Sequence, residues 1–368
     1  VGGFSSQENA LPQTYSQGTV GTFGAGYWGA GGNPSQSEFS TVGRLDFAND
    51  TVKTLTRGPL NITAMEIAAT SSTSHGYFAG GEPSSPSPGT TYVDRVDYSN
   101  DTPTASPRGP LTVQRKIFGA VSNVNFGYFG SGQSGTSKID RIDFGNDTVT
   151  APSVANFPAS GRLTAATGNK NYGYFIGGGN PNRSSISRID YSNDTPTAAL
   201  KGTLSAARGY GSASGNEDFA YHMGGFPGPG GMTSVERLDY SNDTATTVAK
   251  GSLSATVYKN RATGNSSFGY SGGGSPAGNR SSIERIDYSN DTAVASVRSS
   301  LHAALSYMGA SSARSHALPI VGSTVSEFTN VVTRQYYPSS QRGYFGGGNN
   351  PTVLSQTQRI EFSNDTVT

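Results

Sequence analysis

The sequence predicts an all-β fold, a single seven-bladed β-propeller built from four-stranded antiparallel blades. The main observation is a segment that recurs seven times and whose clearest copy joins residues 173–179 to residues 188–195. An Asn-Asp-Thr triplet ends each copy, and successive triplets begin 51, 46, 47, 49, 48 and 74 residues apart. A period near 48 residues is in the range of propeller blades. In addition, no window of 11 or more residues carries a helical apolar stripe, so we expect no long helix.

Composition narrows the function classes. The 368 residues have a formal net charge of +1, which disfavours electrostatic binding to nucleic acid or to an anionic membrane. No apolar run approaches the roughly 18 residues of a membrane-spanning helix. The chain has no cysteine, so disulfides, thiolate metal sites and thiol nucleophiles are excluded. The four histidines have no metal-ligand spacing and are expected at turns or on the surface. We therefore predict no cofactor, no metal and no catalytic residue.

Each period divides into four short extended segments, which we number from the axis of the propeller outward. In the third period the innermost segment lies near residues 114–121 and is rich in small residues. The next two lie at 126–130 and 138–144, and the outermost runs from 148 to about 154. Aromatic and β-branched residues at two-residue spacing favour strands, and Gly-Gly, Asn-Asp and Gly-Asn mark the turns between them.

The two ends of the chain suggest how the ring closes. The chain stops where the outermost strand of the seventh blade should begin, and residues 1–10 precede the first expected innermost strand near Leu11. We therefore expect residues 1–10 to supply the outer strand of blade seven, because a closed sheet leaves no unpaired edge.

The seventh period contains 26 extra residues, at about 314–340, between its two innermost strands. Two interpretations remain open, an added hairpin over one face or a contact arm for a partner. The candidate interaction residues of this insertion are Phe328, Val331, Val332, Tyr336 and Tyr337.

An Arg-x-Asp pair occupies the third strand of each period. Residues two apart on a strand share a face, so these charges are expected to form a structural ladder within and between blades. Such pairs specify strand register better than they add net stability. The pairs are Arg44/Asp46, Arg95/Asp97, Arg141/Asp143, Arg188/Asp190, Arg237/Asp239, Arg285/Asp287 and Arg359/Glu361.

The Asn-Asp-Thr triplets follow this strand and predict hairpin tips, because Asn and Asp cap tight turns. Each triplet is also an Asn-x-Thr glycosylation acceptor, which stays open as an alternative. Calcium binding is disfavoured because the alternating ligands of a calcium loop are missing. The triplets begin at Asn49, Asn100, Asn146, Asn193, Asn242, Asn290 and Asn364.

The Gly-Gly that ends the second strand, with an aromatic strand after it and a small-residue strand before the next copy, resembles kelch repeats. The kelch tryptophan is missing, since Trp28 is the single Trp and lies in a second strand. The sequence of the repeat, Gly-Tyr-Phe-Gly-Gly followed by Arg-Ile-Asp-Tyr-Ser-Asn-Asp-Thr, is similar to repeats in virion structural proteins of marine tailed bacteriophages. This resemblance implies a propeller that serves in a virion.

We therefore expect a non-catalytic structural or interaction propeller, a virion surface, tail or fibre component that contacts other proteins of the assembly or a host receptor or glycan. It would be found in the virion or outside the cell, without nucleic acid and without membrane insertion. The alternative is a secreted, lectin-like propeller, with the triplets as glycosylation acceptors. A glycan-active enzyme with two acidic residues is a third and weaker interpretation.

Overall fold

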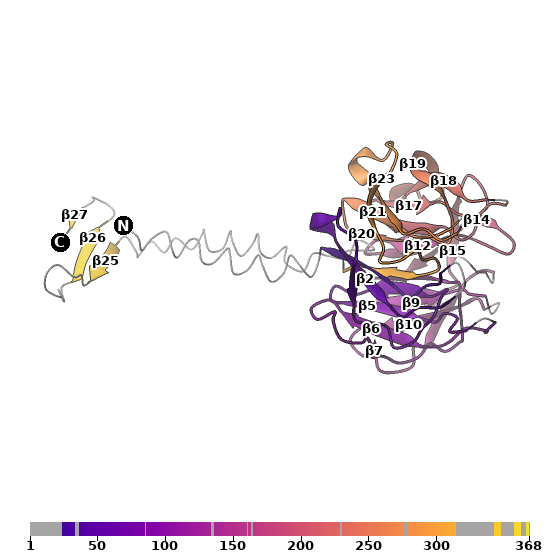
Figure 1. The fold of residues 1–368 in the computed structure, drawn as a ribbon, viewed down its shortest axis with the longest axis horizontal. Coiled ribbons are helices and arrows are strands. Elements are labelled where there is room, and N and C mark those ends of the chain that lie inside the picture. The colour runs from indigo at the N-terminus through magenta and orange to yellow at the C-terminus, as the bar shows by residue number, and fades with distance from the viewer. Residues whose placement is uncertain are drawn as a thin grey trace. The chain divides into compact units, whose positions relative to one another are not determined.

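The computed structural model describes residues 24–313, except 34–36, 85, 134–135, 160, 163–164, 229 and 276–277, together with the backbone of 342–346, 357–361 and 366–367. The chain forms two compact units. One unit, Gln17–Ile320, contains a β-propeller of six blades (Figure 1). The other, Val1–Ser16 with Val321–Thr368, contains a three-stranded sheet of β25 (Arg342–Gly346), β26 (Thr357–Glu361) and β27 (Thr366–Val367).

Each blade of the propeller is a four-stranded antiparallel sheet, whose strands are named in order from the innermost to the outermost. Blade 1 is β24 (Gly309–Ser311), β1 (Ala25–Gly29), β2 (Val42–Asp46) and β3 (Leu55–Arg57). Blade 2 is β4 (Ala68–Ser71), β5 (His75–Ala79), β6 (Val93–Asp97) and β7 (Ser106–Pro107), and blade 3 is β8 (Gly119–Ser122), β9 (Phe126–Gly130), β10 (Lys138–Asp143) and β11 (Ser153–Asn156).

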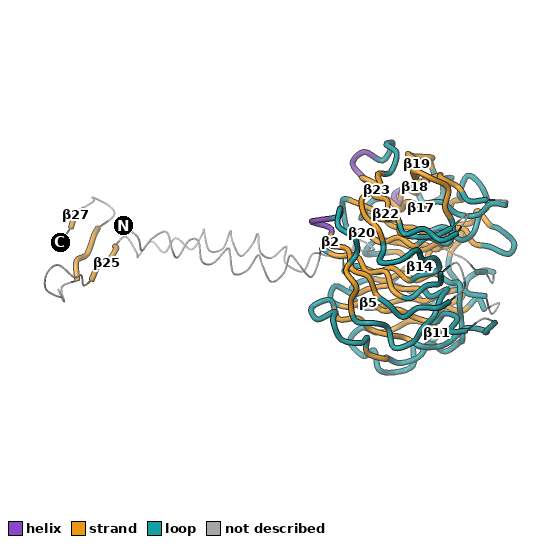
Figure 2. Tube along the Cα trace, viewed as in Figure 1, coloured by secondary structure: helices purple, strands orange, loops and turns teal. Residues whose placement is uncertain are grey.

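Blades 4 to 6 follow in the same order. Blade 4 is β12 (Ala165–Gly168), β13 (Tyr172–Gly178), β14 (Arg183–Asp190) and β15 (Ala199–Thr203). Blade 5 is β16 (Ser212–Gly215), β17 (Phe219–Met223), β18 (Met232–Asp239) and β19 (Val248–Val257), and blade 6 is β20 (Arg261–Gly264), β21 (Phe268–Gly272), β22 (Ser282–Asp287) and β23 (Ser296–Ser300). The helical segments of the described residues are three short 3₁₀ turns, Phe47–Asn49, Tyr240–Asn242 and Tyr288–Asn290 (Figure 2).

The predicted all-β propeller of four-stranded blades is confirmed, but the expected seven blades are wrong, because the ring has six. The innermost segment that follows blade 6 does not begin a seventh blade. It is β24, which pairs with β1 in antiparallel register, with Ser311 opposite Tyr27 and Gly309 opposite Gly29. The innermost strands β24, β4, β8, β12, β16 and β20 then contact one another in a closed circle.

The expected closure by an N-terminal outer strand is therefore also wrong. The ring is closed by β24, which supplies the innermost strand of the first blade and pairs the edge of β1 that faces the axis. The sequence period counts repeats but does not say which repeats share a ring. The seventh repeat supplies β25 and β26 of the second unit instead. Residues 1–10 and the insertion at 314–340 lie outside the described residues.

The repeated glycine that opens the second strand has a packing reason. A Cβ atom at Gly173 would lie 2.5 Å from Val121 on the innermost strand of the preceding blade, and one at Gly76 would lie 2.6 Å from Ser311. At these two positions a side chain would collide with the neighbouring blade, so glycine is needed there. The core accordingly consists of apolar clusters between successive sheets, for example Val121, Tyr128 and Ile139 of blade 3 with Phe175 and Ile189 of blade 4.

Candidate functional site

One buried aspartate joins each blade of the ring to the preceding blade. We call these six side chains the junction carboxylates. Each is the second residue of an Asn-Asp-Thr triplet and is buried, whereas the preceding Asn is exposed. Each accepts a hydrogen bond from the second-strand Tyr and one from the third-strand Arg of the blade before it. The junction carboxylates are Asp50, Asp101, Asp147, Asp194, Asp243 and Asp291.

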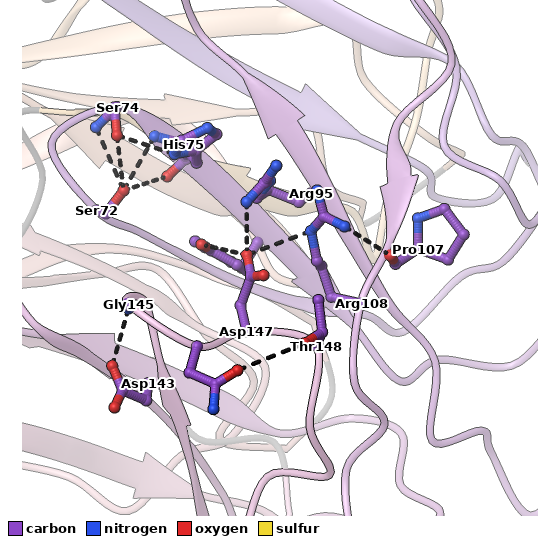
Figure 3. Close-up of polar contacts among 12 residues, drawn as sticks. Ser72, Ser74, His75, Arg95, Pro107, Arg108, Asp143, Gly145, Asp147 and Thr148 are labelled. Atoms are coloured by element: carbon purple, nitrogen blue, oxygen red, sulfur yellow. Dashed lines mark hydrogen bonds and ion pairs between the residues drawn. The ribbon is translucent and has the colours of Figure 1, made fainter.

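Asp147 shows the arrangement (Figure 3). Its Oδ2 atom lies 2.9 Å from the hydroxyl oxygen of Tyr77 and 2.8 Å from Nη1 of Arg95. A second base, Arg108, brings its Nε to 3.3 Å from the same oxygen. The ring of Tyr77 also stacks on Phe144, the aromatic residue just after the third strand of blade 3, at a centroid distance of 4.8 Å. One carboxylate therefore gathers a tyrosine and two arginines from the neighbouring blade.

One junction lacks the second base. In five blades a basic residue near the outermost strand also reaches the junction carboxylate. These residues are, for blades 1, 2, 4, 5 and 6 in order, Arg57, Arg108, Lys201, Lys250 and Arg298. Val154 stands at this position in blade 3. Asp194 is consequently bound by Tyr128 and by one base, Arg141, with no second cationic contact among the described residues.

The structure separates the two members of each predicted Arg-x-Asp pair. The Arg of blades 1 to 6 reaches the junction carboxylate of the next blade, as Arg44 does with Asp101 at 2.8 Å. The Asp caps its own turn, as Asp46 does by accepting a hydrogen bond from the backbone N–H of Ala48 at 2.9 Å. The same capping bond comes from the residue two positions after Asp97, Asp143, Asp190, Asp239 and Asp287. Arg359 and Glu361 lie in β26, where only the backbone is described.

The triplet asparagines of the ring lie at exposed turns. In five triplets the Thr hydroxyl donates a hydrogen bond to the Asn side-chain oxygen, for example Thr51 to Asn49 at 3.2 Å. Asn364 lies outside the described residues, as do the candidate interaction residues Phe328, Val331, Val332, Tyr336 and Tyr337. Among the histidines, His222 departs from expectation. It is buried in β17 beside Arg208, and burial lowers its pKa to about 3.

Sequence reasoning missed the role of the junction carboxylates, although the signal was present. An Asp at the second triplet position and a Tyr in the second strand occur in all seven copies. Many residue types can occupy the second position of a turn, so the turn alone does not explain an Asp in every copy. The repeated Asp and the repeated Tyr together indicated a contact between blades. Burial raises the pKa of the six ring tyrosines well above the usual range, which keeps their hydroxyls protonated as donors.

A second feature is the entrance to the central axis, which we call the axial mouth. The residue two positions before each innermost strand lies here, on the face that carries the loops between second and third strands. Five of these residues are described, and all have a positive φ near +60°. Their backbones form a chain of hydrogen bonds, such as Glu66 N–H to the Tyr307 carbonyl at 2.8 Å and Tyr307 N–H to the Lys259 carbonyl at 3.0 Å. The five residues are Glu66, Ile117, Tyr210, Lys259 and Tyr307.

The side chains of the axial mouth differ although their backbones match. On the side of blades 5, 6 and 1, Tyr210 makes edge contacts with Phe226, Tyr258 and Tyr307 at centroid distances of 5.9–6.3 Å. The ammonium of Lys259 lies 5.1 Å from the ring centroid of Tyr258 and 4.8 Å from that of Tyr307, which are cation–π distances. The side chains on this side of the mouth are partly exposed, namely Tyr210, Phe226, Tyr258, Lys259 and Tyr307. This side of the mouth therefore presents aromatic rings around one cation.

The opposite side of the mouth is acidic and buried. Lys116 lies 2.6 Å from Glu82 and 3.6 Å from Glu66, and all three are less than a tenth exposed. Burial raises the pKa of Glu66 to about 7, against the lowering effect of Lys116. Below the mouth the axis holds a narrow cavity of about 50 Å³, lined by small residues of the innermost strands and by Arg261. Such a volume admits a few water molecules rather than a ligand.

Comparison with known proteins adds no family, because neither a family model nor a curated protein sequence matches the chain. The propeller arrangement is consistent with kelch-like repeats in general. No group of three or more His, Asp or Glu side chains that could hold a metal occurs among the described residues. In the same part of the chain, no helix is long and apolar enough to cross a membrane.

Proposed function

We propose that this protein is a non-catalytic interaction scaffold and that its six-bladed ring binds a partner at the axial mouth. The observation that carries this proposal is the contrast between the repeat and the mouth. Five equivalent backbone positions with nearly identical φ carry Glu66, Ile117, Tyr210, Lys259 and Tyr307. Where only the fold matters, as at the junction carboxylates, the repeat keeps one residue type. A change of side chain at constant backbone indicates recognition.

Two buried acids of the ring, Asp140 and Glu236, have structural contacts. Asp140 is paired with Arg115 and accepts from the backbone N–H of Thr112. Glu236 is paired with Arg208, and hydrogen bonds from Ser205 and Thr247 outweigh its burial and lower its pKa to about 2. These contacts support a binding role over an acid–base mechanism.

We further propose that the assembly is a virion and that the partner is a structural protein of the particle or a host receptor. The similarity of the repeat sequence to repeats of virion structural proteins supports this assignment. A closed ring that needs no disulfide also suits a particle outside the cell. The test is sedimentation of native particles from the source, with mass spectrometry of each fraction. The protein should travel with megadalton particles. Recovery as a free 38.1 kDa chain would refute the virion role.

The axial mouth is tested separately by placing a photo-crosslinking amino acid at Tyr258 in the assembled particle. A single protein should crosslink there, whereas the same residue at Val294, which is exposed on the outer part of blade 6, should give no product with that protein. Equal crosslinking from both positions would contradict recognition at the mouth.

One observation favours carbohydrate binding as a second candidate function. The rings of Tyr210, Phe226, Tyr258 and Tyr307 gather on one side of the mouth, and such rings stack on the apolar faces of sugars as they do on other flat surfaces. The repeated tyrosines in the second strands of the six blades do not form this platform, since they are fully buried. A glycan array with the unmodified chain and with Tyr258→Ala distinguishes the two functions, because only a lectin loses a discrete glycan signal in the variant.

A further inference from the structure

Blades 3 and 5 contain a buried ion pair at equivalent positions. In blade 3, Arg115 lies 2.9 Å from Asp140, and in blade 5, Arg208 lies 2.7 Å from Glu236. All four side chains are at most 2% exposed, so each pair fills the space between the third strand and the turn that enters the blade. The acid also caps this turn by accepting a backbone N–H, from Thr112 in blade 3 and from Ser205 in blade 5.

Blade 4 lacks every part of this arrangement. Gly161 stands where blades 3 and 5 have Arg, and Ser187 stands where they have the acid. Pro158 stands where Thr112 and Ser205 donate a backbone hydrogen bond to the acid, and proline has no N–H to donate. The volume of two large side chains is therefore missing from the same place in the fold.

A cavity of about 250 Å³ occupies this place. Its wall is largely apolar, with Phe157 and Phe175 in edge-to-face contact at 4.8 Å and with Leu200, which is 61% exposed, at the rim. Arg183 and Ser187 add polar groups to the lining. The cavity is smaller than the pockets that hold drug-sized molecules, so it suits a small ligand.

Arg183 shows which chemical group such a ligand would carry. In blade 6 the equivalent residue, Arg280, lies four positions before the acid Glu284 and 3.1 Å from it. Arg183 likewise lies four positions before Ser187, which has no charge to offer. Among the described residues, no acidic side chain forms an ion pair with Arg183. Its partly buried side chain therefore lines the cavity at the point where blades 2, 3, 5 and 6 supply a carboxylate.

We propose that this cavity is a binding site for a small carboxylate with a short apolar chain. The ligand carboxylate takes the position that Glu284 holds in blade 6 and binds Arg183, and its apolar chain packs on Phe157 and Phe175. A guanidinium binds a carboxylate through paired, charge-assisted hydrogen bonds, and the apolar wall gains from losing contact with water. The site is separate from the axial mouth and does not depend on the function proposed for it.

The test is calorimetric titration of the full chain with hexanoate and with hexanol, which has the same chain length and no charge. Hexanoate should bind saturably, and hexanol should bind at least about tenfold more weakly, since a charge-assisted hydrogen bond is worth that much or more. Saturable binding of both probes with equal affinity would overturn the role of Arg183, and no heat with either would overturn the site.

Three variants make the test specific. Arg183→Gln should weaken hexanoate binding at least about tenfold and leave hexanol binding unchanged. The matched control is Arg280→Gln in blade 6, which removes the same type of side chain at the equivalent position and should leave hexanoate affinity unchanged. Ser187→Glu restores the missing acid, so it should pair with Arg183, abolish hexanoate binding and keep or raise the Tm. Equal loss in the two Arg variants, or full binding by Ser187→Glu, would refute the proposal.

Discussion

Asp50 is the junction carboxylate between the last blade and the first, and Asp50→Asn should weaken the closure of the ring. Arg298 donates to its Oδ1 from Nε at 3.0 Å and from Nη2 at 2.8 Å, and Arg285 donates to its Oδ2 from Nη1 at 2.7 Å. Tyr270 adds a fourth bond at 3.0 Å. Asn keeps the shape and the bond from Tyr270 but removes the charge that holds both arginines.

The magnitude follows from burial. Asp50 is 4% exposed, and breaking a buried ion pair by removing one partner costs about 3–5 kcal/mol. The side chains of Arg285 and Arg298 are 24% and 31% exposed, so solvent screening reduces that value. We expect a loss of about 2–4 kcal/mol in the free energy of unfolding, which lowers the Tm by roughly 4–10 °C in a ring of this size.

The assay is urea unfolding followed by tryptophan fluorescence. Trp28 is the single Trp, it is buried, and its Nε1 donates to the carbonyl of Arg261 in blade 6 at 3.2 Å. Its emission therefore reports on the same junction that Asp50 joins. The matched control is Asp194→Asn, which removes a junction carboxylate that binds Tyr128 and Arg141 but no second base. The control should lose about 1–2 kcal/mol less than Asp50→Asn.

The pH dependence gives an independent check. Burial by itself would raise the pKa of Asp50, but hydrogen bonds from Arg298 and Tyr270 and the charges of Arg285 and Arg298 bring its pKa below the usual value. A lowered pKa contributes stability that is fully present above the unfolded pKa near 3.9 and is lost as pH falls through the folded pKa. The difference between the unmodified chain and Asp50→Asn should therefore be full at pH 6 and smaller at pH 3. Equal losses in Asp50→Asn and Asp194→Asn, or a pH-independent difference, would refute this reasoning.

Three further predictions test other features of the ring. Asp94→Asn should stabilise the chain by about 2–3 kcal/mol at pH 7, because burial raises the pKa of Asp94 to about 6 and disfavours its ionised form. The gain should vanish below about pH 4, where Asp94 is protonated in both the folded and the unfolded chain. Urea unfolding at the two pH values measures this difference. Val154→Lys should supply the missing second base of Asp194 and raise the free energy of unfolding by up to about 1 kcal/mol, measured in the same way. A chain that ends at Ala313 should keep the blue-shifted emission of Trp28, whereas one that ends at Tyr307 lacks β24 and should lose it.

Each of these predictions has a contradicting result. A gain for Asp94→Asn that persists at pH 3 would mean that its charge is not the cause. Val154→Lys is compared with Val149→Lys, an exposed position outside the Asp194 junction, and equal effects would show that a base at Val154 does not act through Asp194. Native Trp28 emission in the chain that ends at Tyr307 would show that β24 does not close the ring.

The sequence predicted the blade well and the ring less well. Strands at 126–130 and 138–144 were expected, and the structure has Phe126–Gly130 and Lys138–Asp143, because alternation and glycine turns act locally. Blade number depends on which edge accepts Gly309–Ser311, and a three-residue strand of small residues carries no signal for its partner. The axial mouth was missed although Glu66, Tyr210 and Lys259 share one position in the repeat, because the sequence does not show their common positive φ or their place around the axis.

The pairing of β24 with β1 has a consequence for how the ring can be combined with other segments in one polypeptide. Ser311 lies opposite Tyr27, so the polypeptide enters and leaves the ring at neighbouring points on the face of the Asn-Asp-Thr turns. A ring with adjacent entry and exit behaves as a cassette, because it can be inserted into a longer polypeptide or removed from it while the flanking segments remain joined. Both ends of the ring, at β1 and at β24, lie on the face opposite the axial mouth.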